Sequence, residues 1–159
     1  MPRAEPSRDD VHISRTVELL GGRRTFHRAV RSRLEAHDLL QKGLPGHALE
    51  HLVNYVGILR TPRHGSLEKA VGISIRTYQR RKDAPDRALS PEQSGRAWKF
   101  AEILGRAIGV FGSQAQAEAW LEQPAMALDD RKPIDLLSTP AGVESVEDHL
   151  TRLEYGVYT

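Results

Sequence analysis

The stretch SPEQSGRAWKFAEILGRAIGVF, residues 90–111, carries the strongest helix signal in the chain. Ser90 is a favoured N-cap residue, Pro91 suits the first helical position, and Gln93 stands where its amide can reach back to the cap. Apolar residues then recur every three or four positions, at Ala97, Ala101, Leu104, Ile108 and Phe111. More apolar residues beside this stripe widen the face, so we predict a long, almost completely buried helix that ends near residue 111.

Two further helix starts follow on the C-terminal side. Ser113 predicts the cap of a short helix, and Thr139-Pro140 opens the last helix of the chain. Between them, Asp129-Asp130 is expected to form a turn, because aspartate tolerates unusual backbone angles.

The N-terminal side is less regular. Residues 48–56 show helical spacing of apolar side chains, and residues 34–40 are compatible with a short helix. Residues 11–30 fit either a short strand or a helix, and the polar residues 1–10, with two prolines, are expected to be a disordered arm. Since no hairpin signal follows residue 34, we predict a mostly or wholly α-helical fold.

Residues 66–82, SLEKAVGISIRTYQRRK, have the pattern of a helix-turn-helix. A first helix begun by Ser66 as its cap turns its apolar side chains inward, Gly72 permits the positive φ of the turn, and Ser74 caps the second helix. Arginine and glutamine on the outer face of that helix suit bidentate contacts with guanine and adenine. We therefore predict a DNA-reading surface, formed by Ile75, Arg76, Thr77, Gln79, Arg80 and Lys82. The alternative is an ordinary helical hairpin with a charged face.

Charge is distributed unevenly along the chain. Residues 60–87 contain eight Lys/Arg and three acidic residues, a local balance of +5. Residues 128–159 contain seven acidic residues and three Lys/Arg, a local balance of −4. A basic N-terminal part and an acidic C-terminal part indicate two different partners. The charge distribution and the motifs together divide the chain into an arm (1–10), a helix-turn-helix DNA-binding domain (11–88) and a small helical domain (89–159).

Several classes of protein are disfavoured. No stretch approaches the roughly 18 apolar residues that span a membrane, and the first residues lack the apolar centre of a secretory signal. The chain has no cysteine, which fits a reducing cytoplasm. His47 and His51 lie four apart but lack an evident third ligand, so we favour surface or core histidines over a zinc site. With no nucleophile elbow, phosphate loop or paired acids, we expect no enzyme and no cofactor.

A set of short motifs, in order along the chain, resembles one family. The motifs are Gly72-Ile73-Ser74, Leu89-Ser90-Pro91-Glu92-Gln93-Ser94, Val110-Phe111-Gly112, Ala119-Trp120-Leu121, Pro133-x-Asp135-Leu136-Leu137 and Gly156-Val157-Tyr158. Together they resemble the Xre/MbcA/ParS antitoxins, most of all the Xre antitoxins of RES–Xre toxin–antitoxin pairs. The sequence differs from that family at Asp129-Asp130, where glycines are usual.

The resemblance implies a non-enzymatic protein with two tasks. It implies that the chain neutralises a RES-domain toxin, an enzyme that consumes NAD, and that it binds its own promoter DNA together with that toxin. Members of the family form dimers, and their C-terminal domain blocks the cleft of the toxin.

The last residues, Tyr155, Gly156, Val157, Tyr158 and Thr159, are the predicted toxin-binding segment. Gly156 stands where a left-handed residue would end the last helix. We expect Tyr158 and the Thr159 carboxylate to enter or cover the toxin cleft, with Tyr155 at its mouth. We also place part of the apolar helix 91–111 at a homodimer interface, because a small monomer cannot easily hide so much apolar surface. The alternative function is a stand-alone dimeric helix-turn-helix transcription regulator.

Overall fold

The structure, a computed structural model, describes residues 4–61 and 65–156. The helices are α1 (Arg8–Leu19), α2 (Gly22–Phe26), α3 (Arg33–Lys42), α4 (Gly46–Tyr55), α5 (Ser66–Val71), α6 (Ile75–Arg81), α7 (Pro91–Phe111), α8 (Gln114–Leu121) and α9 (Pro140–Glu154). Short 3-10 turns are η1 (Gly57–Arg60), η3 (Met126–Leu128) and η4 (Pro133–Leu136). In these two ranges the β structure is limited to an isolated bridge between Ala125 and Arg131, so the predicted all-α fold is confirmed.

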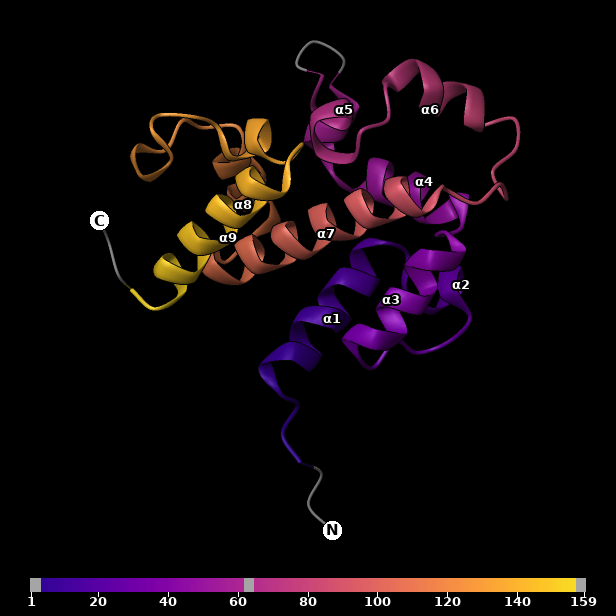
Figure 1. Ribbon diagram of the computed structural model, residues 1–159, viewed down its shortest axis with the longest axis horizontal. Coiled ribbons are helices and arrows are strands. Elements are labelled where there is room, and N and C mark those ends of the chain that lie inside the picture. The colour runs from indigo at the N-terminus through magenta and orange to yellow at the C-terminus, as the bar shows by residue number, and fades with distance from the viewer. Residues whose placement is uncertain (1–3, 62–64, 157–159) are drawn as a thin grey trace.

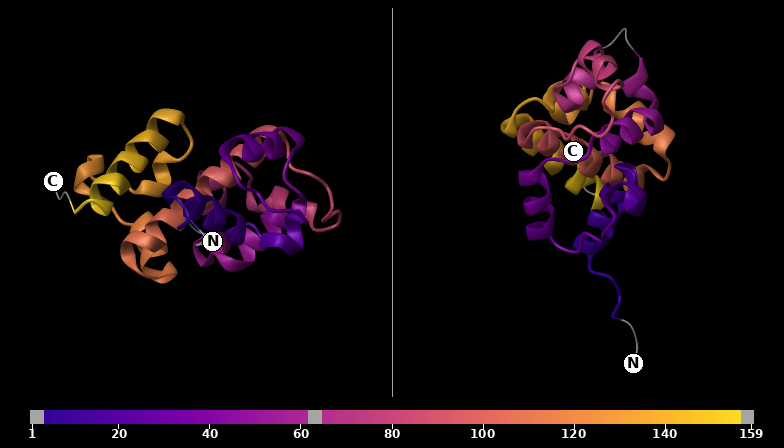
Figure 2. Two further views of the ribbon diagram at one scale, coloured as in Figure 1. Left: turned by 90° about the horizontal axis from the view of Figure 1, so that it is seen from below. Right: turned by 90° about the vertical axis from the view of Figure 1, so that its right-hand side faces the viewer.

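The 21-residue helix α7 runs through the middle of the molecule, and the other helices pack around it (Figure 1). Helices α1 and α3 lie on one side of α7, and α5 and α6 lie on the other, as the right view of Figure 2 also shows. Helices α8 and α9 pack at its C-terminal half. Because α7 touches both the N-terminal and the C-terminal helices, a single core joins the two halves of the chain.

The start and end of α7 follow the predicted signals. The backbone N–H of Gln93 donates to Ser90 Oγ at 3.1 Å, and the N–H of Ser90 donates to Gln93 Oε1 at 3.1 Å. This reciprocal pair satisfies two N–H groups that the first turn of a helix leaves without a partner. At the other end Gly112 has φ +89°, which stops the helix after Phe111. The predicted bounds of this helix are therefore confirmed.

The burial of α7 removes one argument for a dimer. Its apolar residues from Ala97 to Ala107 are almost fully buried within one chain. Helix α1 covers part of this surface, and its buried side chains Ile13 and Leu19 belong to the same core. The premise that a monomer cannot hide this helix is wrong, because α1 covers it. The pattern of residues 11–30 does not predict that packing.

The predicted disordered arm, residues 1–10, is wrong for residues 8–10. The side chain of Ser7 accepts a hydrogen bond from the N–H of Asp10 at 3.1 Å, and the N–H of Ser7 donates to Asp10 Oδ2 at 2.9 Å. This capping box starts α1 at Arg8. The hydrogen bonds from Ser7 also lower the pKa of Asp10 below its usual value. Residues 1–3 lie outside the described part of the chain.

The loop between α8 and α9 contains two left-handed residues. Asp129 has φ +54° and Asp130 has φ +58°. The N–H of Asp130 donates to the Ala125 carbonyl at 3.0 Å, and the N–H of Ala125 donates to the Arg131 carbonyl at 3.1 Å. The predicted turn is confirmed, and it occurs where the resembled family usually has glycines.

We expect Asp130→Gly to raise the free energy of unfolding by about 0.5–1 kcal/mol, because glycine adopts positive φ without the steric cost of a Cβ atom. Urea denaturation of the two proteins measures the difference. Asp83→Gly is the matched control, since Asp83 is exposed and its φ is not positive. That change should lower stability, by up to about 1 kcal/mol, through backbone entropy alone. A loss of stability in Asp130→Gly would contradict the expectation.

Candidate DNA-binding and toxin-binding surfaces

The helix-turn-helix forms as the sequence predicts. Gly72 has φ +76° in the turn after α5, and Ser74 Oγ accepts a hydrogen bond from the N–H of Thr77 at 3.1 Å to cap α6. Tyr78 is 8% exposed and anchors α6 to the core. Ser66 is the exception, because Gly65 caps α5 and the buried Ser66 hydroxyl donates to Glu122 Oε1 at 3.1 Å.

The predicted reading residues lie mostly on the free face of α6. Arg76, Thr77, Gln79, Arg80 and Lys82 are exposed. Ile75 differs from the prediction, because it is half-buried and packs against the hydrophobic core. The first turn of α6 rests on the core at this position, so an apolar side chain is needed there.

Arg81 has a structural task that its sequence position did not reveal. Its Nη2 donates to the carbonyl of Arg87 at 2.7 Å and to the carbonyl of Ala88 at 3.0 Å. Burial, and then the charge of Arg87, lower the pKa of the Arg81 guanidinium from its ordinary value. These bonds fix the loop after α6 and leave Arg80 and Arg87 beside a groove of about 560 Å³ along the same helix. The basic surface therefore extends from α6 to the start of α7.

The end of α9 also follows the prediction. Gly156 has φ +69°, and its N–H donates to the Leu153 carbonyl at 3.1 Å, so the left-handed stop is confirmed. Tyr155, directly before it, is 64% exposed. Val157, Tyr158 and Thr159 lie outside the described residues, and their predicted contact with a toxin stays a prediction.

Side chains from three helices meet at the last residue of α9. Glu154 Oε2 lies 3.4 Å from Arg106 Nη2 on α7 and 3.9 Å from Arg8 Nη2 on α1. Its other oxygen, Oε1, lies 3.8 Å from His12 Nε2 on α1. The Arg8 guanidinium also lies over the ring of Tyr155, 4.8 Å from its centroid, and donates to the Tyr155 hydroxyl. Sequence patterns could not reveal this cluster, because its members are far apart along the chain.

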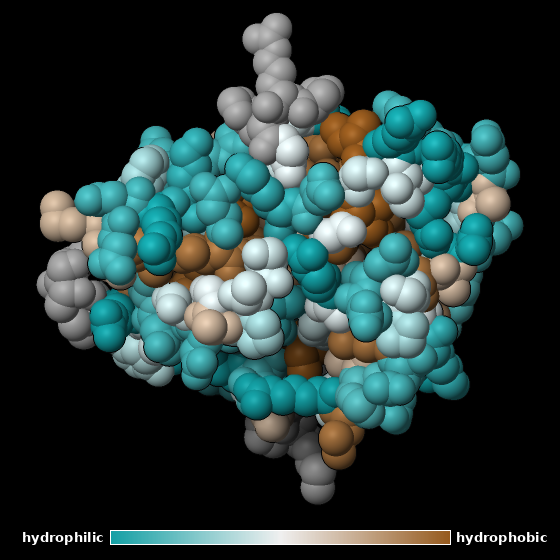
Figure 3. Space-filling model, turned by 45° about the horizontal axis from the view of Figure 1, so that its top comes forward, coloured by the Kyte–Doolittle hydropathy of each residue, from teal (hydrophilic) through white to brown (hydrophobic). Residues whose placement is uncertain are grey.

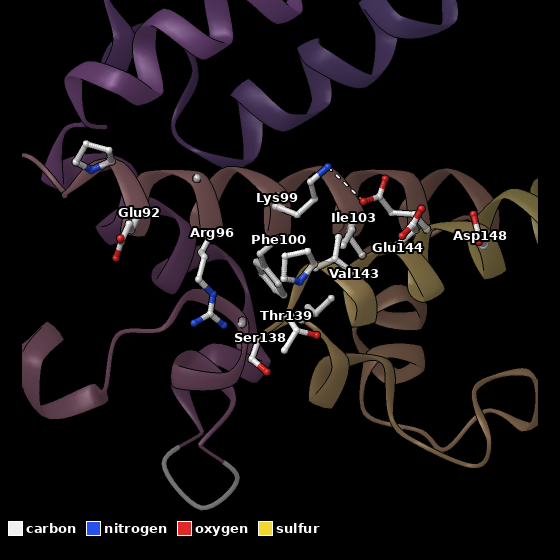
Figure 4. A pocket seen from close by; sticks show the side chains of 16 residues that line it. Glu92, Arg96, Lys99, Phe100, Ile103, Ser138, Thr139, Val143, Glu144 and Asp148 are labelled. Carbon is white, nitrogen blue, oxygen red and sulfur yellow. Dashed lines mark ion pairs between the residues drawn. The ribbon is translucent and has the colours of Figure 1, made fainter.

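A groove of about 1090 Å³ runs between α7 and α9 (Figure 4). Phe100, Ile103 and Val143 form apolar parts of its lining, and Glu144 and Asp148 of α9 stand along it. Lys99 Nζ bridges the two helices through an ion pair with Glu147 Oε1 at 3.3 Å. Figure 3 shows a largely hydrophilic face in which apolar atoms are visible in hollows. The exposed charged residues of α9 are Glu144, Asp148 and Arg152, a small acidic excess, whereas those of α6 are basic.

The two histidines of α4 have separate partners. His47 Nε2 lies 2.8 Å from Asp86 Oδ1, and this hydrogen bond raises the pKa of His47 above its usual value. His51 Nδ1 lies 3.1 Å from the Leu19 carbonyl, and its ring stacks on Tyr55 at 5.0 Å between centroids. In residues 4–61 and 65–156, no three His, Cys, Asp or Glu side chains gather as a metal site would require.

Over the same ranges, each helix is too short or too polar to cross a bilayer.

Two family models match successive segments of this chain. Residues 35–102 match the family model of the antitoxin Xre-like helix-turn-helix domain, and residues 106–156 match that of the antitoxin Xre/MbcA/ParS C-terminal toxin-binding domain. The two matched segments meet within α7, and α1 and α2 lie before both of them.

Three similar proteins are each named antitoxin Xre. The protein from Yersinia enterocolitica (serotype O:8 / biotype 1B) is 35% identical over 92 residues, which cover 57% of this chain and 62% of that protein. The protein from Photorhabdus laumondii is 27% identical over 120 residues, 75% of this chain and 78% of that protein. The protein from Pseudomonas putida is 31% identical over 84 residues, 53% of this chain and 52% of that protein. With both domains matched in order, the chain belongs to the Xre/MbcA/ParS family of antitoxins.

Proposed function

We propose that this chain is the non-enzymatic antitoxin of a type II toxin–antitoxin pair in the cytoplasm, and that its toxin is a RES-domain enzyme that degrades NAD. The observation that carries the proposal is the exposed end of α9, where Tyr155 is 64% exposed and Gly156 stops the helix. This end belongs to the segment that matches the toxin-binding domain, and it lies far from α6 in the molecule (Figure 1). Toxin and DNA can therefore bind at the same time.

The chemistry of α9 suits the cleft of such a toxin. A cleft that holds the pyrophosphate of NAD should present basic side chains, and the exposed side of α9 carries Glu144 and Asp148. Tyrosine is a favoured anchor in protein interfaces, because it buries a large area for little loss of side-chain entropy. The C-terminal domain thus offers an acidic field for docking and a tyrosine end that blocks the cleft.

Co-expression tests this proposal. The proposal requires a RES-type gene beside the gene for this chain, and that gene, expressed alone, should stop bacterial growth and deplete cellular NAD. Expression of this chain from a second plasmid should restore both. Persistent growth arrest, with both proteins present at similar levels, would sink the proposal and leave a stand-alone regulator as the function. An NAD-consumption assay on the purified chain alone checks the expected absence of enzymatic activity.

We propose further that α6 reads the promoter of the chain's own operon. Arg76, Gln79 and Arg80 are exposed on its free face, which suits base contacts in the major groove. Arg87, beside the groove next to α6, adds positive charge for a phosphate contact. A two-fold operator requires two copies of α6, so the DNA-bound form is a homodimer.

The double variant Arg76→Ala, Arg80→Ala should bind promoter DNA about 100-fold more weakly, because each good bidentate contact contributes about 1–3 kcal/mol. Fluorescence anisotropy with a labelled promoter duplex measures the affinity. In the native chain, the affinity should also fall steeply with salt, since phosphate contacts release counterions. Toxin neutralisation should be unchanged in the double variant.

Arg131→Ala is the control for the loss of positive charge. Arg131 is exposed in the loop after η3, away from α6, so its removal should leave DNA affinity nearly unchanged. Normal promoter binding by the Arg76, Arg80 variant would show that α6 is not the reading helix.

A further inference from the structure

Helix α1 lies outside both matched family segments, yet it packs closely along α7. Gly105 and Gly109 of α7 face Arg15 of α1, and a Cβ atom at Gly109 would collide with the Arg15 guanidinium. Arg15 Nη1 donates to the Gly105 carbonyl at 3.5 Å. A Cβ atom at Gly105 would make ordinary van der Waals contact with Arg15 and Leu19, so α1 packs directly on this face of α7. The first turn of α1 then lies beside the end of α9, where Arg8 and His12 approach Glu154.

Glu154 is the point at which α1, α7 and α9 meet. The side chains of Arg106 and Glu154 are 11% and 16% exposed, so this ion pair is shielded from water. Arg106 also donates to Thr151 Oγ1 at 2.9 Å, which fixes its guanidinium on the last turns of α9. Arg8 and His12 approach the same carboxylate from α1. Three cationic or potentially cationic side chains therefore surround one carboxylate, two residues before Gly156.

Arg8 holds Tyr155 as well as Glu154. Its guanidinium lies 4.8 Å from the centroid of the Tyr155 ring, and it donates to the hydroxyl of the same residue. The side chain of Arg8 is itself 56% exposed, so it forms part of the surface around the end of α9. A planar guanidinium that contacts both a carboxylate and an aromatic ring restricts the rotation of each.

We propose that α1 positions the toxin-binding end of the chain, with Arg8 and Glu154 as positioning residues. By holding Tyr155 and the last turn of α9, they set the direction in which the chain leaves the helix at Gly156. The toxin then meets an end that is already oriented, and binding loses less conformational entropy. The inference rests on the proposed function, because it assigns to α1 a part in the toxin-binding end.

A double-mutant cycle tests the inference, with the purified toxin that this chain neutralises in the co-expression experiment as the probe. Isothermal titration calorimetry compares Arg8→Ala in the full chain with Arg8→Ala in a chain truncated after Glu154. We expect Arg8→Ala to weaken binding about three- to tenfold in the full chain and to have no effect in the truncated chain. Arg24→Ala, an exposed arginine of α2, should leave the affinity unchanged in both backgrounds.

Each other outcome is decisive. An equal loss of toxin affinity from Arg8→Ala in the full and the truncated chain would overturn the inference. Arg8 would then contact the toxin directly or act through the general stability of α1. No loss in the full chain would also overturn it. If the truncated chain binds as tightly as the full chain, the proposed role of the tail fails instead. Glu154→Gln in the full chain is a second test. We expect its affinity for the toxin to fall at least threefold while its circular dichroism spectrum is unchanged.

Discussion

Deletion of residues 156–159 is expected to abolish toxin neutralisation while the chain stays folded and still binds promoter DNA. The deletion starts at Gly156, beyond the last helical residue Glu154, and a Cβ atom at Gly156 would meet nothing within 4 Å. The deletion removes the hydrogen bond from the Gly156 N–H to the Leu153 carbonyl, and it keeps Val146 and Leu150, the buried residues of α9. Anchoring tyrosines at interface centres typically contribute 2 kcal/mol or more, so loss of Tyr158 and the terminal carboxylate should weaken toxin binding by at least about 30-fold.

Growth and cellular NAD, measured during co-expression with the toxin, report the loss of neutralisation. Thermal unfolding and promoter binding of the purified variant should match those of the full chain. Deletion of residues 2–4 is the matched control, because it shortens the chain at the other end and keeps Ser7, the cap of α1. A shortened chain that still protects cells fully would exclude the tail as the blocking segment.

Gly142→Ala is expected to lower the free energy of unfolding by about 3 kcal/mol. A Cβ atom at Gly142 would overlap the Leu136 carbonyl oxygen and come within 2.9 Å of its carbon and 3.1 Å of its Cα. These are backbone atoms of η4, which cannot rotate away as a side chain could. The N–H of Gly142 also donates to Thr139 Oγ1 at 3.0 Å, so movement of the first turn of α9 would disturb its cap. Urea denaturation measures the change.

Gly95→Ala is the matched control for this substitution. Gly95 lies within α7, and a Cβ atom there would meet nothing within 4 Å. Alanine in a helix interior reduces the entropy of the unfolded chain, so this variant should be more stable by about 0.5–1 kcal/mol. The two substitutions add the same methyl group, but the changes in the free energy of unfolding should have opposite signs. If both variants were more stable, or both less stable, backbone contact with Leu136 would not be what limits the space at Gly142.

Local signals in the sequence predicted the helix starts well. Ser90, Ser113 and Thr139 each accept the backbone hydrogen bond expected of an N-cap. Capping depends on a residue and the three that follow it, so it can be read without the rest of the fold. The left-handed positions Gly72 and Gly156 are predictable for the same reason, since they depend on local backbone geometry.

Long-range packing was not predictable in the same way. Residues 11–30 gave no clear period, so the sequence did not show that α1 would cover α7. Because the sequence does not show this cover, it predicts that part of the apolar surface of α7 lies at a homodimer interface. The contact between Arg8 and Tyr155 was missed for a related reason, because 147 positions separate the two residues. Ile75 was placed outside because the pattern of α6 alone does not show which turn rests on the core.

The continuity of α7 has a mechanical consequence. This helix contains 21 residues and is about 30 Å long at 1.5 Å per residue, and no proline interrupts it after its first position. The loop from α6 enters at one end, and Arg106 binds the last turn of α9 near the other. A stiff rod of this kind transmits torque, so DNA held by α6 and a protein held by the end of α9 would turn as one body. If the proposed function holds, the length of α7 would fix the distance between the bound toxin and the operator.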